Sequence, residues 1–505
     1  MVVRPRLNRL LLSQLLAGVA EVSPQQECEI QRLTLNSQHV MPGDLFVALS
    51  GVRQHGADFI DQAVMAGAVA VLCEEADGLP ETWACSVPVF VIDDLDQQLG
   101  CIASRFFGHP SRSMKVIGIT GTNGKTTCAQ LLAQALNDKH LCGVIGTLGC
   151  GLYGQQEANG YTTPDAIEVH RLMAEMRDMG AQYVVMEVSS HGLVQGRVEG
   201  VSFDIAVFTN LSRDHLDYHG DMKSYGGAKR RLFEMPGLKH AVINTDDAFG
   251  RALLHELTGR IGLTAYSLEL AHGLPENPLV SGQELSLGHD GLRMLVRDPK
   301  GRTAIRSSLL GRFNAANLLA VYGVLLWLGF QRNLIAARLG KCVAVPGRME
   351  CFTKPGLPLV VVDYAHTPEA LEQVLGALRE HCEGKLWCLF GCGGERDKGK
   401  RPLMGALAES LADKVVLTDD NPRNEDGACI IVDIISGIEY KGDIAVIADR
   451  AEAISSVIAK AEPDDVVLVA GKGHEDYQLV AGEVLPFSDA QLVIDRLSLR
   501  FEVAS

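Results

Sequence analysis

The chain has 505 residues, which at about 150 residues per domain corresponds to roughly two to four domains. Its 47% hydrophobic and 21% charged residues are typical of a globular protein with several buried cores. A net charge of -16 argues against binding nucleic acid or another polyanion by bulk electrostatics, so any phosphate must be held by local sites.

The N-terminal stretch "MVVRPRLNRLLLSQLLAGVA" has two interpretations. Arginines followed by leucines resemble a short signal peptide. Ser13 and Gln14 interrupt the apolar stretch, however, and the leucines fall at helical spacing, which favours a surface helix of the first domain. The longest other apolar run, 318–330, is shorter than the about 20 residues that cross a bilayer, so we expect no membrane span.

Apolar strand patterns alternate with helical patterns along the rest of the chain. The stretch "MKVIGITGTNGKTTCAQLLAQAL" reads as a strand, a glycine-rich turn and an amphipathic helix, and another helix is expected from about Pro368. Continuous apolar strands between helices predict an α/β fold with mainly parallel sheets covered on both faces. The expected strands lie at 44–49, 69–73, 87–92, 183–188, 203–210, 240–247, 358–364, 386–394, 414–422, 444–448 and 465–476.

The thirteen cysteines form no CxxC pair, and a disulfide framework is not expected in a chain this long. We therefore predict a reduced, cytoplasmic protein. Cys388 and Cys392 in "CLFGC" are at a spacing that could suit a metal, but their apolar surroundings favour buried small hydrophobic residues.

The sharpest single motif is "TGTNGKTT", residues 120–127. Glycines allow backbone N–H groups to close around phosphate, a lysine adds charge, and the next hydroxyl can bind Mg²⁺. The strict pattern would need glycine at Ile119, and a plain helix start is the alternative. Its place between a strand and a helix predicts nucleotide binding at Gly121, Thr122, Asn123, Gly124, Lys125, Thr126 and Thr127.

Two strand-end clusters, "MEVSSHGLVQGR" and "TNLSRDHLDYHG", are rich in carboxylates and imidazoles. Glu187 and His215 are plausible Mg²⁺ ligands beside the phosphate-binding loop. The alternative is that Asp214, His215 and His219 cap helices and solvate a loop. Lys229 in "GGAKRRLF" is, on the residues alone, one more surface lysine.

Taken together, the motifs of this chain resemble the Mur ligases. The resemblance rests on "GTNGKTT", "MEVSSHGL", "TNLSRDHLDYHG", "GRFNAANLLA", "VPGRME", "VVDYAHTPEAL", "FGCGGERDKGKR", "DNPR" and "AGKGHE", which occur in order along essentially the whole chain. It implies three domains: a uridine-nucleotide domain at 1–100, a central P-loop ATPase domain at 101–345 and a Rossmann-like amino-acid-binding domain at 346–505.

The resemblance also implies the chemistry. These enzymes transfer the γ-phosphate of ATP to a carboxylate of a nucleotide-linked peptide, and an amine then attacks the acyl phosphate. Lys125 and Thr126 with Mg²⁺ would neutralise phosphate charge, and Lys229 matches a lysine that CO₂ carbamylates. The implied metal ligands are Thr126, Glu187, His215 and Lys229, and the implied catalytic residues are Lys125, Glu187, His215 and Lys229.

The resemblance assigns further contacts. The nucleotide would meet Asn314, Arg348 and Asp363, whose alternatives are a helix-start amide, an inter-domain salt bridge and a strand-end carboxylate. The implied peptide contacts are Thr162, Thr163, Ser189, Gln195 and Arg197. The implied uridine contacts are Leu35 and Ser37. Here the chain departs from many relatives, which have Asp-Ser-Arg where it has Asn36-Ser37-Gln38, and Tyr161 stands where an asparagine is common.

The stretch "DDNPR" follows an apolar strand, where open α/β sheets bind ligands. In the family it meets the incoming amino acid, and Arg423 offers a fork for the distal carboxylate of meso-diaminopimelate, which lysine lacks. The implied partners are UDP-N-acetylmuramoyl-L-alanyl-D-glutamate and meso-diaminopimelate. The implied amino acid contacts are Arg396, Asp420, Asn421, Pro422, Arg423, Gly471 and Glu475.

The alternatives come from two classes. A P-loop switch that binds partners needs an [NT]KxD motif to read guanine, and the chain has none. The closer rivals are the lysine-adding ligase, the later dipeptide-adding ligase and the folate-polyglutamate synthetases, against which "DNPR" and "GKGHE" argue. We expect a monomer.

Overall fold

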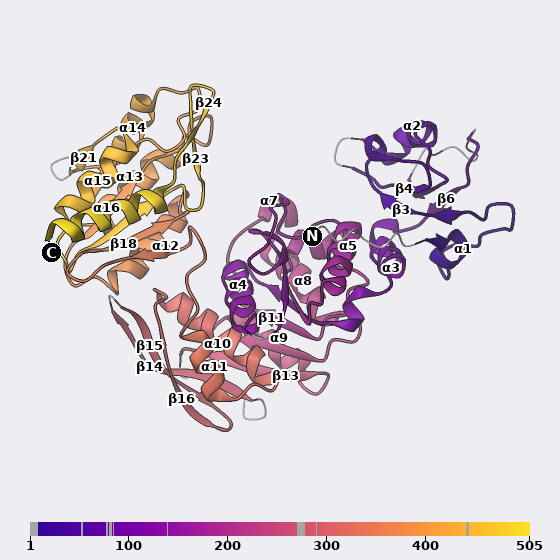
Figure 1. The fold of residues 1–505 in the computed structure, drawn as a ribbon, viewed down its shortest axis with the longest axis horizontal. Helices are drawn as coiled ribbons and strands as arrows, with labels where there is room; N and C mark the ends of the chain where they lie inside the picture. The colour runs from indigo at the N-terminus through magenta and orange to yellow at the C-terminus, as the bar shows by residue number, and fades with distance from the viewer. Residues whose placement is uncertain are drawn as a thin grey trace. The chain divides into compact units, whose positions relative to one another are not determined.

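The computed structural model describes residues 9–51, 54–76, 79, 83, 85–138, 140–269, 278–288, 290–440 and 444–504. The chain divides into two compact units, the first running to Tyr266 and the second from Leu279 to the C-terminus. Figure 1 shows the elements of each unit, coloured from indigo at the N-terminus to yellow at the C-terminus. No helix in these described ranges is long and apolar enough to cross a membrane.

The first unit begins with a four-stranded parallel sheet in the order β3-β4-β5-β6. Every residue of β4 is buried, and α3 packs Leu95, Leu99 and Ile102 into the core beside the sheet. The elements are β3 (Arg32–Thr34), η1 (Ser37–His39), β4 (Asp44–Ala48), η2 (Gly56–Phe59), α2 (Ile60–Met65), β5 (Ala70–Glu74), β6 (Val89–Ile92) and α3 (Leu95–Phe106).

The expected N-terminal surface helix is wrong in length and exposure. Residues 1–8 lie outside the described residues, and the helix that follows has a single turn. The side chains of Leu12, Leu15 and Leu16 are fully buried in the core of the first sheet. The helical spacing of the leucines therefore serves the core. The elements are β1 (Leu10–Leu11), α1 (Leu12–Leu15) and β2 (Glu29–Ile30).

Seven further strands of the first unit lie side by side in the order β13-β12-β11-β7-β10-β8-β9, all parallel to their neighbours except β9. β7 lies in the middle and is buried from its second residue on, as expected for a strand covered on both faces. The strands are β7 (Lys115–Thr120), β8 (Cys142–Gly146), β9 (Gly149–Leu152), β10 (Tyr183–Glu187), β11 (Ile205–Phe208), β12 (His240–Asn244) and β13 (Gly262–Ser267).

Side-chain caps begin several helices of this unit. Asp165 accepts a hydrogen bond from the backbone of Glu168, and Asp247 accepts one from that of Gly250. The helices are η3 (Pro110–Ser113), α4 (Lys125–Leu136), α5 (Ala166–Asp178), α6 (Ser190–Val194), α7 (Leu216–His219), α8 (Met222–Arg230), η4 (Arg231–Glu234) and α9 (Ala248–Leu257).

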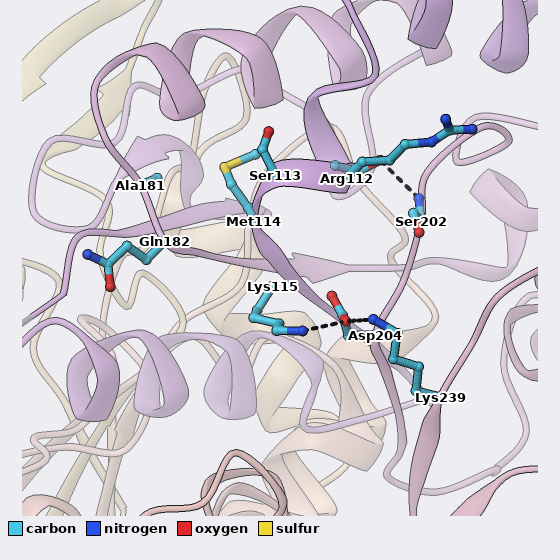
Figure 2. A pocket seen from close by; sticks show the side chains of 10 residues that line it. Arg112, Ser113, Met114, Lys115, Ala181, Gln182, Ser202, Asp204 and Lys239 are labelled. Atoms are coloured by element: carbon cyan, nitrogen blue, oxygen red, sulfur yellow. Dashed lines mark hydrogen bonds and ion pairs between the residues drawn. The ribbon is translucent and has the colours of Figure 1, made fainter.

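Asp204 fixes the amino-terminal edge of these strands. Its carboxylate accepts a 3.1 Å bond from the backbone of Val116 and pairs with Lys115 at 3.1 Å and Lys239 at 2.6 Å (Figure 2). Burial opposes its ionisation, but the bonds from Lys239, Val116 and Lys115 outweigh burial and lower the pKa of Asp204. The cluster lines a polar cavity of about 250 Å³ and ties the starts of β7, β11 and β12 together.

The second unit holds an antiparallel set of strands in the order β16-β15-β14 and a six-stranded sheet in the order β17-β18-β22-β19-β20-β21, parallel except for β17. Its elements are β14 (Leu279–Gly288), β15 (Gly291–Asp298), β16 (Gly301–Ser307), α10 (Arg312–Trp327), α11 (Arg332–Leu339), β17 (Glu350–Phe352), β18 (Leu359–Asp363), α12 (Pro368–Arg379), β19 (Leu386–Phe390), α13 (Lys400–Leu411), β20 (Lys414–Leu417), α14 (Gly427–Ile435), β21 (Ile444–Val446), α15 (Arg450–Lys460), β22 (Val466–Ala470), β23 (Tyr477–Val480), β24 (Glu483–Pro486) and α16 (Asp489–Ala504).

Alternate residues of the six-stranded sheet enter two cores. Val361 faces the helices α12, α13 and α14, whereas Val360 and Val362 face α15 and α16. This is the alternation of side chains that a strand imposes. The expected α/β fold with mainly parallel sheets is confirmed, as is the helix from Pro368.

All thirteen cysteines lie in described residues and are free thiols. Cys388 and Cys392 are buried, as the sequence predicts, and burial raises the pKa of both thiols. The exposed thiols are Cys101 on α3 in the first unit and Cys429 on α14 in the second.

Candidate functional site

The phosphate loop, residues 120–127, joins the carboxyl end of β7 to the start of α4. Gly121 and Gly124 have φ of +151° and +83°, and a Cβ atom on Gly121 would lie 1.9 Å from the hydroxyl oxygen of Thr209. The Asn123 backbone N–H donates to the side chain of Asn210 at 2.9 Å. The residues after β11 therefore hold the loop, and both positions need glycine.

Lys125 is the first residue of α4. Its Nζ donates to the carbonyl oxygens of Gly121 at 2.9 Å and Thr122 at 2.8 Å. Burial lowers the pKa of Lys125, and the charges of Glu187 and Asp214 oppose this shift. A cation fixed over a glycine-rich turn at a helix N-terminus is suited to bind phosphate oxygens.

Glu187 ends β10, in register with Ile119 of β7, and is fully buried. The Thr126 hydroxyl donates to its carboxylate at 2.7 Å, and Thr147 donates its backbone N–H at 2.9 Å and its hydroxyl at 3.2 Å. Burial raises the pKa of Glu187, while the bonds from Thr126 and Thr147 act in the opposite direction. The structure thus joins the phosphate loop to this carboxylate.

The Thr126 hydroxyl and the Glu187 carboxylate are hard oxygen ligands of the kind Mg²⁺ prefers, with the remaining positions left to water and phosphate. This donor set fits the implied ion. His215 is an exposed residue at φ +52° whose ring lies 4.8 Å from that of His191. Among the described residues, no group of three or more His, Cys, Asp or Glu side chains is placed to hold a metal.

Lys229 lies on α8 and is 1% exposed. Its Nζ donates to the Gly121 carbonyl oxygen at 2.9 Å and lies 4.3 Å from the ring centroid of Tyr225. Burial, helped by the charge of Lys125, lowers the pKa of Lys229 to about 6. The residue is therefore a buried amine beside the phosphate loop rather than a surface lysine.

The expected peptide contacts form one connected group. The Thr163 hydroxyl donates to the Glu187 carbonyl oxygen at 2.9 Å and lies 3.1 Å from the Ser189 hydroxyl. Arg197 donates to the Thr163 carbonyl oxygen at 2.7 Å and to the Gln195 side chain at 2.6 Å. The fifth contact, Thr162, shares a 3.0 Å bond with Thr147. All five expected residues therefore surround the end of β10.

The expected uridine contacts lie where β3 passes into η1. Leu35 packs partly against the first core, and the buried Ser37 hydroxyl donates to Gln62 at 3.2 Å. The Asn36 side chain caps η1 by accepting from the Gln38 backbone at 2.9 Å. An asparagine at this position therefore has a structural role as a neutral cap.

The remaining nucleotide candidates belong to the second unit. Asn314 is buried in α10 and donates to the Leu310 carbonyl oxygen at 2.8 Å. The Arg348 guanidinium lies 5.0 Å from the ring centroid of Tyr364. Both carboxylate oxygens of Asp363 accept backbone N–H bonds, from Met349 and Ala365. This carboxylate therefore fixes the turns beside the end of β18.

The second unit brings most of the expected amino acid contacts to the carboxyl edge of its parallel sheet, in an amino acid subsite. Asp420 is buried, and its Oδ1 has no hydrogen-bond donor among the described residues. Burial raises the pKa of Asp420, against the charges of Arg450 and Lys472. Gly471 has φ +115°, and a Cβ atom on it would lie 2.9 Å from Asp420. The subsite consists of Asp420, Asn421, Pro422, Arg423, Gly471 and Glu475.

Arg423 and Arg396 differ in how they are held. Arg423 has φ +55° and donates from its guanidinium to the Gly394 carbonyl oxygen at 2.6 Å. Arg396 is exposed. A Cβ atom on Gly394 would lie 2.0 Å from the Pro422 carbonyl oxygen, so the loops after β19 and β20 are in close contact.

Several site residues were not expected from the sequence. Thr147 follows β8 and holds Glu187, and Lys472 lies inside the amino acid subsite. Asn210 and Thr209, which hold the phosphate loop, lie in a stretch noted for its charged residues. Position just after a buried strand is the signal that could have found all four.

Three family comparisons match successive parts of the chain. Residues 29–107 match the Mur ligase family catalytic domain, residues 119–325 the Mur ligase middle domain, and residues 347–473 the Mur ligase glutamate ligase domain.

The relatives similar to this chain agree with one another. A UDP-N-acetylmuramoyl-L-alanyl-D-glutamate–2,6-diaminopimelate ligase from Pseudomonas aeruginosa is 50% identical, over 93% of this chain and 96% of its own. One of the same name from Coxiella burnetii is 46% identical, over 92% and 94%. A solved structure of an enzyme of that name has a TM-score of 0.76 at 35% identity and covers 97% of this chain and 99% of its own. The chain therefore belongs to the Mur ligase family.

Proposed function

We propose that the chain is an ATP-dependent ligase that adds meso-diaminopimelate to UDP-N-acetylmuramoyl-L-alanyl-D-glutamate in the cytoplasm, during synthesis of the peptidoglycan precursor. The observation that carries the proposal is the 50% identity, over 93% of the chain, to a relative named for this reaction. The position of Arg423 beside a buried carboxylate subsite supports a substrate with both ammonium and carboxylate groups at one end.

We assign the uridine end of the substrate to residues 1–100, ATP to residues 101–345 and the amino acid to residues 346–505. Asn314, Arg348 and Asp363 are proposed as further nucleotide contacts from the second unit. Leu35 and Ser37 are proposed for uridine. The peptide is assigned to the connected group of Thr162, Thr163, Ser189, Gln195 and Arg197.

In the first step, a carboxylate oxygen of the peptide attacks the γ-phosphorus of ATP, the bond to the β-phosphate oxygen breaks, and ADP leaves an acyl phosphate. Lys125 and the loop N–H groups stabilise the charge on the transferred phosphoryl group. Neutralising phosphate charge is also what Mg²⁺ supplies when bound. Its proposed ligands are Thr126, Glu187, His215 and Lys229.

Lys229 is proposed to carry a carbamate. With its pKa lowered to about 6, the amine is largely neutral at neutral pH and can attack CO₂. A nitrogen–carbon bond then forms, a proton is released, and an anion replaces a cation next to the phosphate loop. An anion there favours a divalent cation, whereas an ammonium would repel it.

In the second step, an amine of the amino acid attacks the acyl carbon, an amide forms, and phosphate leaves with the carbon–oxygen bond. Asp420 and Glu475 are proposed to accept hydrogen bonds from ammonium groups, and Arg423 to bind the distal carboxylate. A lysine substrate would leave Arg423 without that partner, which is a penalty as well as a lost attraction.

The test is ADP release by the purified chain with ATP, Mg²⁺, the UDP-muramoyl dipeptide and a panel of amino acids. We expect release that requires both the dipeptide and meso-diaminopimelate. Equal use of L-lysine would favour the lysine-adding ligase. Nucleotide binding with no release under any of these conditions would favour a P-loop switch.

A further inference from the structure

Lys472 is a buried cation inside the amino acid subsite. It lies two residues after β22 and its side chain is 0% exposed. Its Nζ donates to Asn421 Oδ1 at 3.1 Å and Glu475 Oε2 at 3.3 Å, and lies 3.8 Å from Asp420 Oδ1. The same ammonium lies 5.6 Å from the ring centroid of Tyr477. Its three polar neighbours are all proposed amino acid contacts.

Asn421 passes this contact on to Glu475. Its Oδ1 accepts from Lys472 and from the Leu479 backbone N–H at 2.9 Å, and its Nδ2 donates to Glu475 Oε2 at 2.9 Å. The same Glu475 oxygen therefore accepts from both the amide and the ammonium. Asn421 is used on both sides, which makes it a spacer that fixes Glu475.

The charges of the subsite also depend on Lys472. Asp420 and Glu475 would contribute two negative charges, and Lys472 cancels one of them. The nearby Arg450 does not cancel the other, because it is paired with Asp489 at 2.7 Å and both side chains are fully buried. The subsite is therefore left with one negative charge, which one ammonium group of a substrate would balance.

We infer that Lys472 is a positioning residue for the amino acid: it holds Asn421 and Glu475 in place and leaves the subsite with a single negative charge. The inference rests on the proposed function, since it assigns the subsite to the amino acid substrate. It predicts that Lys472 affects the amino acid without affecting the nucleotides.

The test is Lys472→Met, which keeps the length of the side chain and removes the charge. The KM for meso-diaminopimelate should rise at least about tenfold, because a buried carboxylate loses its cation and its orientation. The KM values for ATP and the UDP-dipeptide should stay within about twofold. A variant with a lower melting temperature and an unchanged amino acid KM overturns the inference.

Asp465→Asn is the matched control, at the other end of β22. Asp465 is also buried and accepts bonds from the Lys385 backbone at 2.7 Å and the Trp387 indole at 2.9 Å. It should lower the melting temperature and leave all three KM values unchanged. If Lys472→Met does not fold, Lys472→Gln keeps a donor for Asn421 and should still raise the amino acid KM; an unchanged KM then overturns the inference.

A double-mutant cycle tests the route of the effect. If Lys472 acts through Asn421, Lys472→Met combined with Asn421→Ala should lower kcat/KM for the amino acid little more than the worse single variant. Full additivity overturns this route. Absence of ADP release by the wild type overturns the proposed function and this inference with it, whereas an active wild type with an unaffected Lys472→Met variant overturns the inference alone.

Discussion

The Nζ atom of Lys229 lies 2.9 Å from the carbonyl oxygen of Gly121, so α8 is bonded to the first glycine of the phosphate loop. Because this amine is buried and faces the charge of Lys125, its pKa falls to about 6. Two predictions depend on this contact.

Lys229→Ala should be nearly inactive and should recover part of its activity when short carboxylic acids are added. The acid would occupy the vacated space and supply the missing anion. The measurement is ADP release with and without acetate or formate. Lys223→Ala, an exposed change on the same helix, should keep its activity and not respond to acid. Full activity of Lys229→Ala without any acid would contradict the carbamate role.

Lys229→Met should raise the melting temperature in CO₂-free buffer. Between about pH 6 and the ordinary lysine pKa of 10.5, the unfolded chain binds a proton here that the folded chain does not. Wild-type stability therefore rises with pH across this window, and the cost of burying the amine is fully present below it. The variant should gain most near pH 6 and least near pH 10. A difference that does not change with pH would show that the amine titrates normally.

Lys125→Ala should lower turnover at least about a hundredfold, as removal of single electrostatic stabilisers does. Lys115→Ala is its control, on the same strand that leads to the loop but at the opposite edge, about 17 Å away at about 3.3 Å per residue. The control should stay within about twofold in turnover. Near-normal ADP release by Lys125→Ala would remove the phosphate loop from the mechanism.

Arg423→Ala should lose most activity with meso-diaminopimelate, by on the order of a thousandfold in kcat/KM. The charge-assisted pair is worth roughly 1.5 to 3 kcal/mol, and its loss leaves the carboxylate unpaired. The KM values for ATP and the UDP-dipeptide should change little. Arg379→Ala, which removes an exposed pair with Asp413, should be neutral. Wild-type use of lysine at the same rate would exclude Arg423 as the selector.

Buried parallel strands were the most predictable part of the fold. Each is covered on both faces and therefore reads as a continuous apolar run, as in Val360–Val362. The antiparallel strands β14 to β16 were not expected, because their exposed face makes "LVSGQELSLG" mostly polar. The single turn of α1 was also misread, since helical spacing of leucines does not report which face is buried.

The site was predictable where side chains follow strands, as for Glu187 and Asp420. Contacts over long sequence separations were not. Lys472 meets Asn421, 51 residues away, and nothing near either residue in the sequence predicts that bond. Lys229 was indistinguishable from a surface lysine until its burial was seen.

The two exposed thiols provide a built-in distance ruler. Cys101 lies on the first unit and Cys429 on the second, so a fluorescent donor and acceptor attached to them would report the separation of the units through energy transfer. Burial raises the pKa of the Cys101 thiol, so its reactive thiolate needs more alkaline buffer, which favours labelling the two positions in sequence. Addition of ATP or the peptide substrate would then be read out as a change in transfer efficiency, with no engineered cysteine.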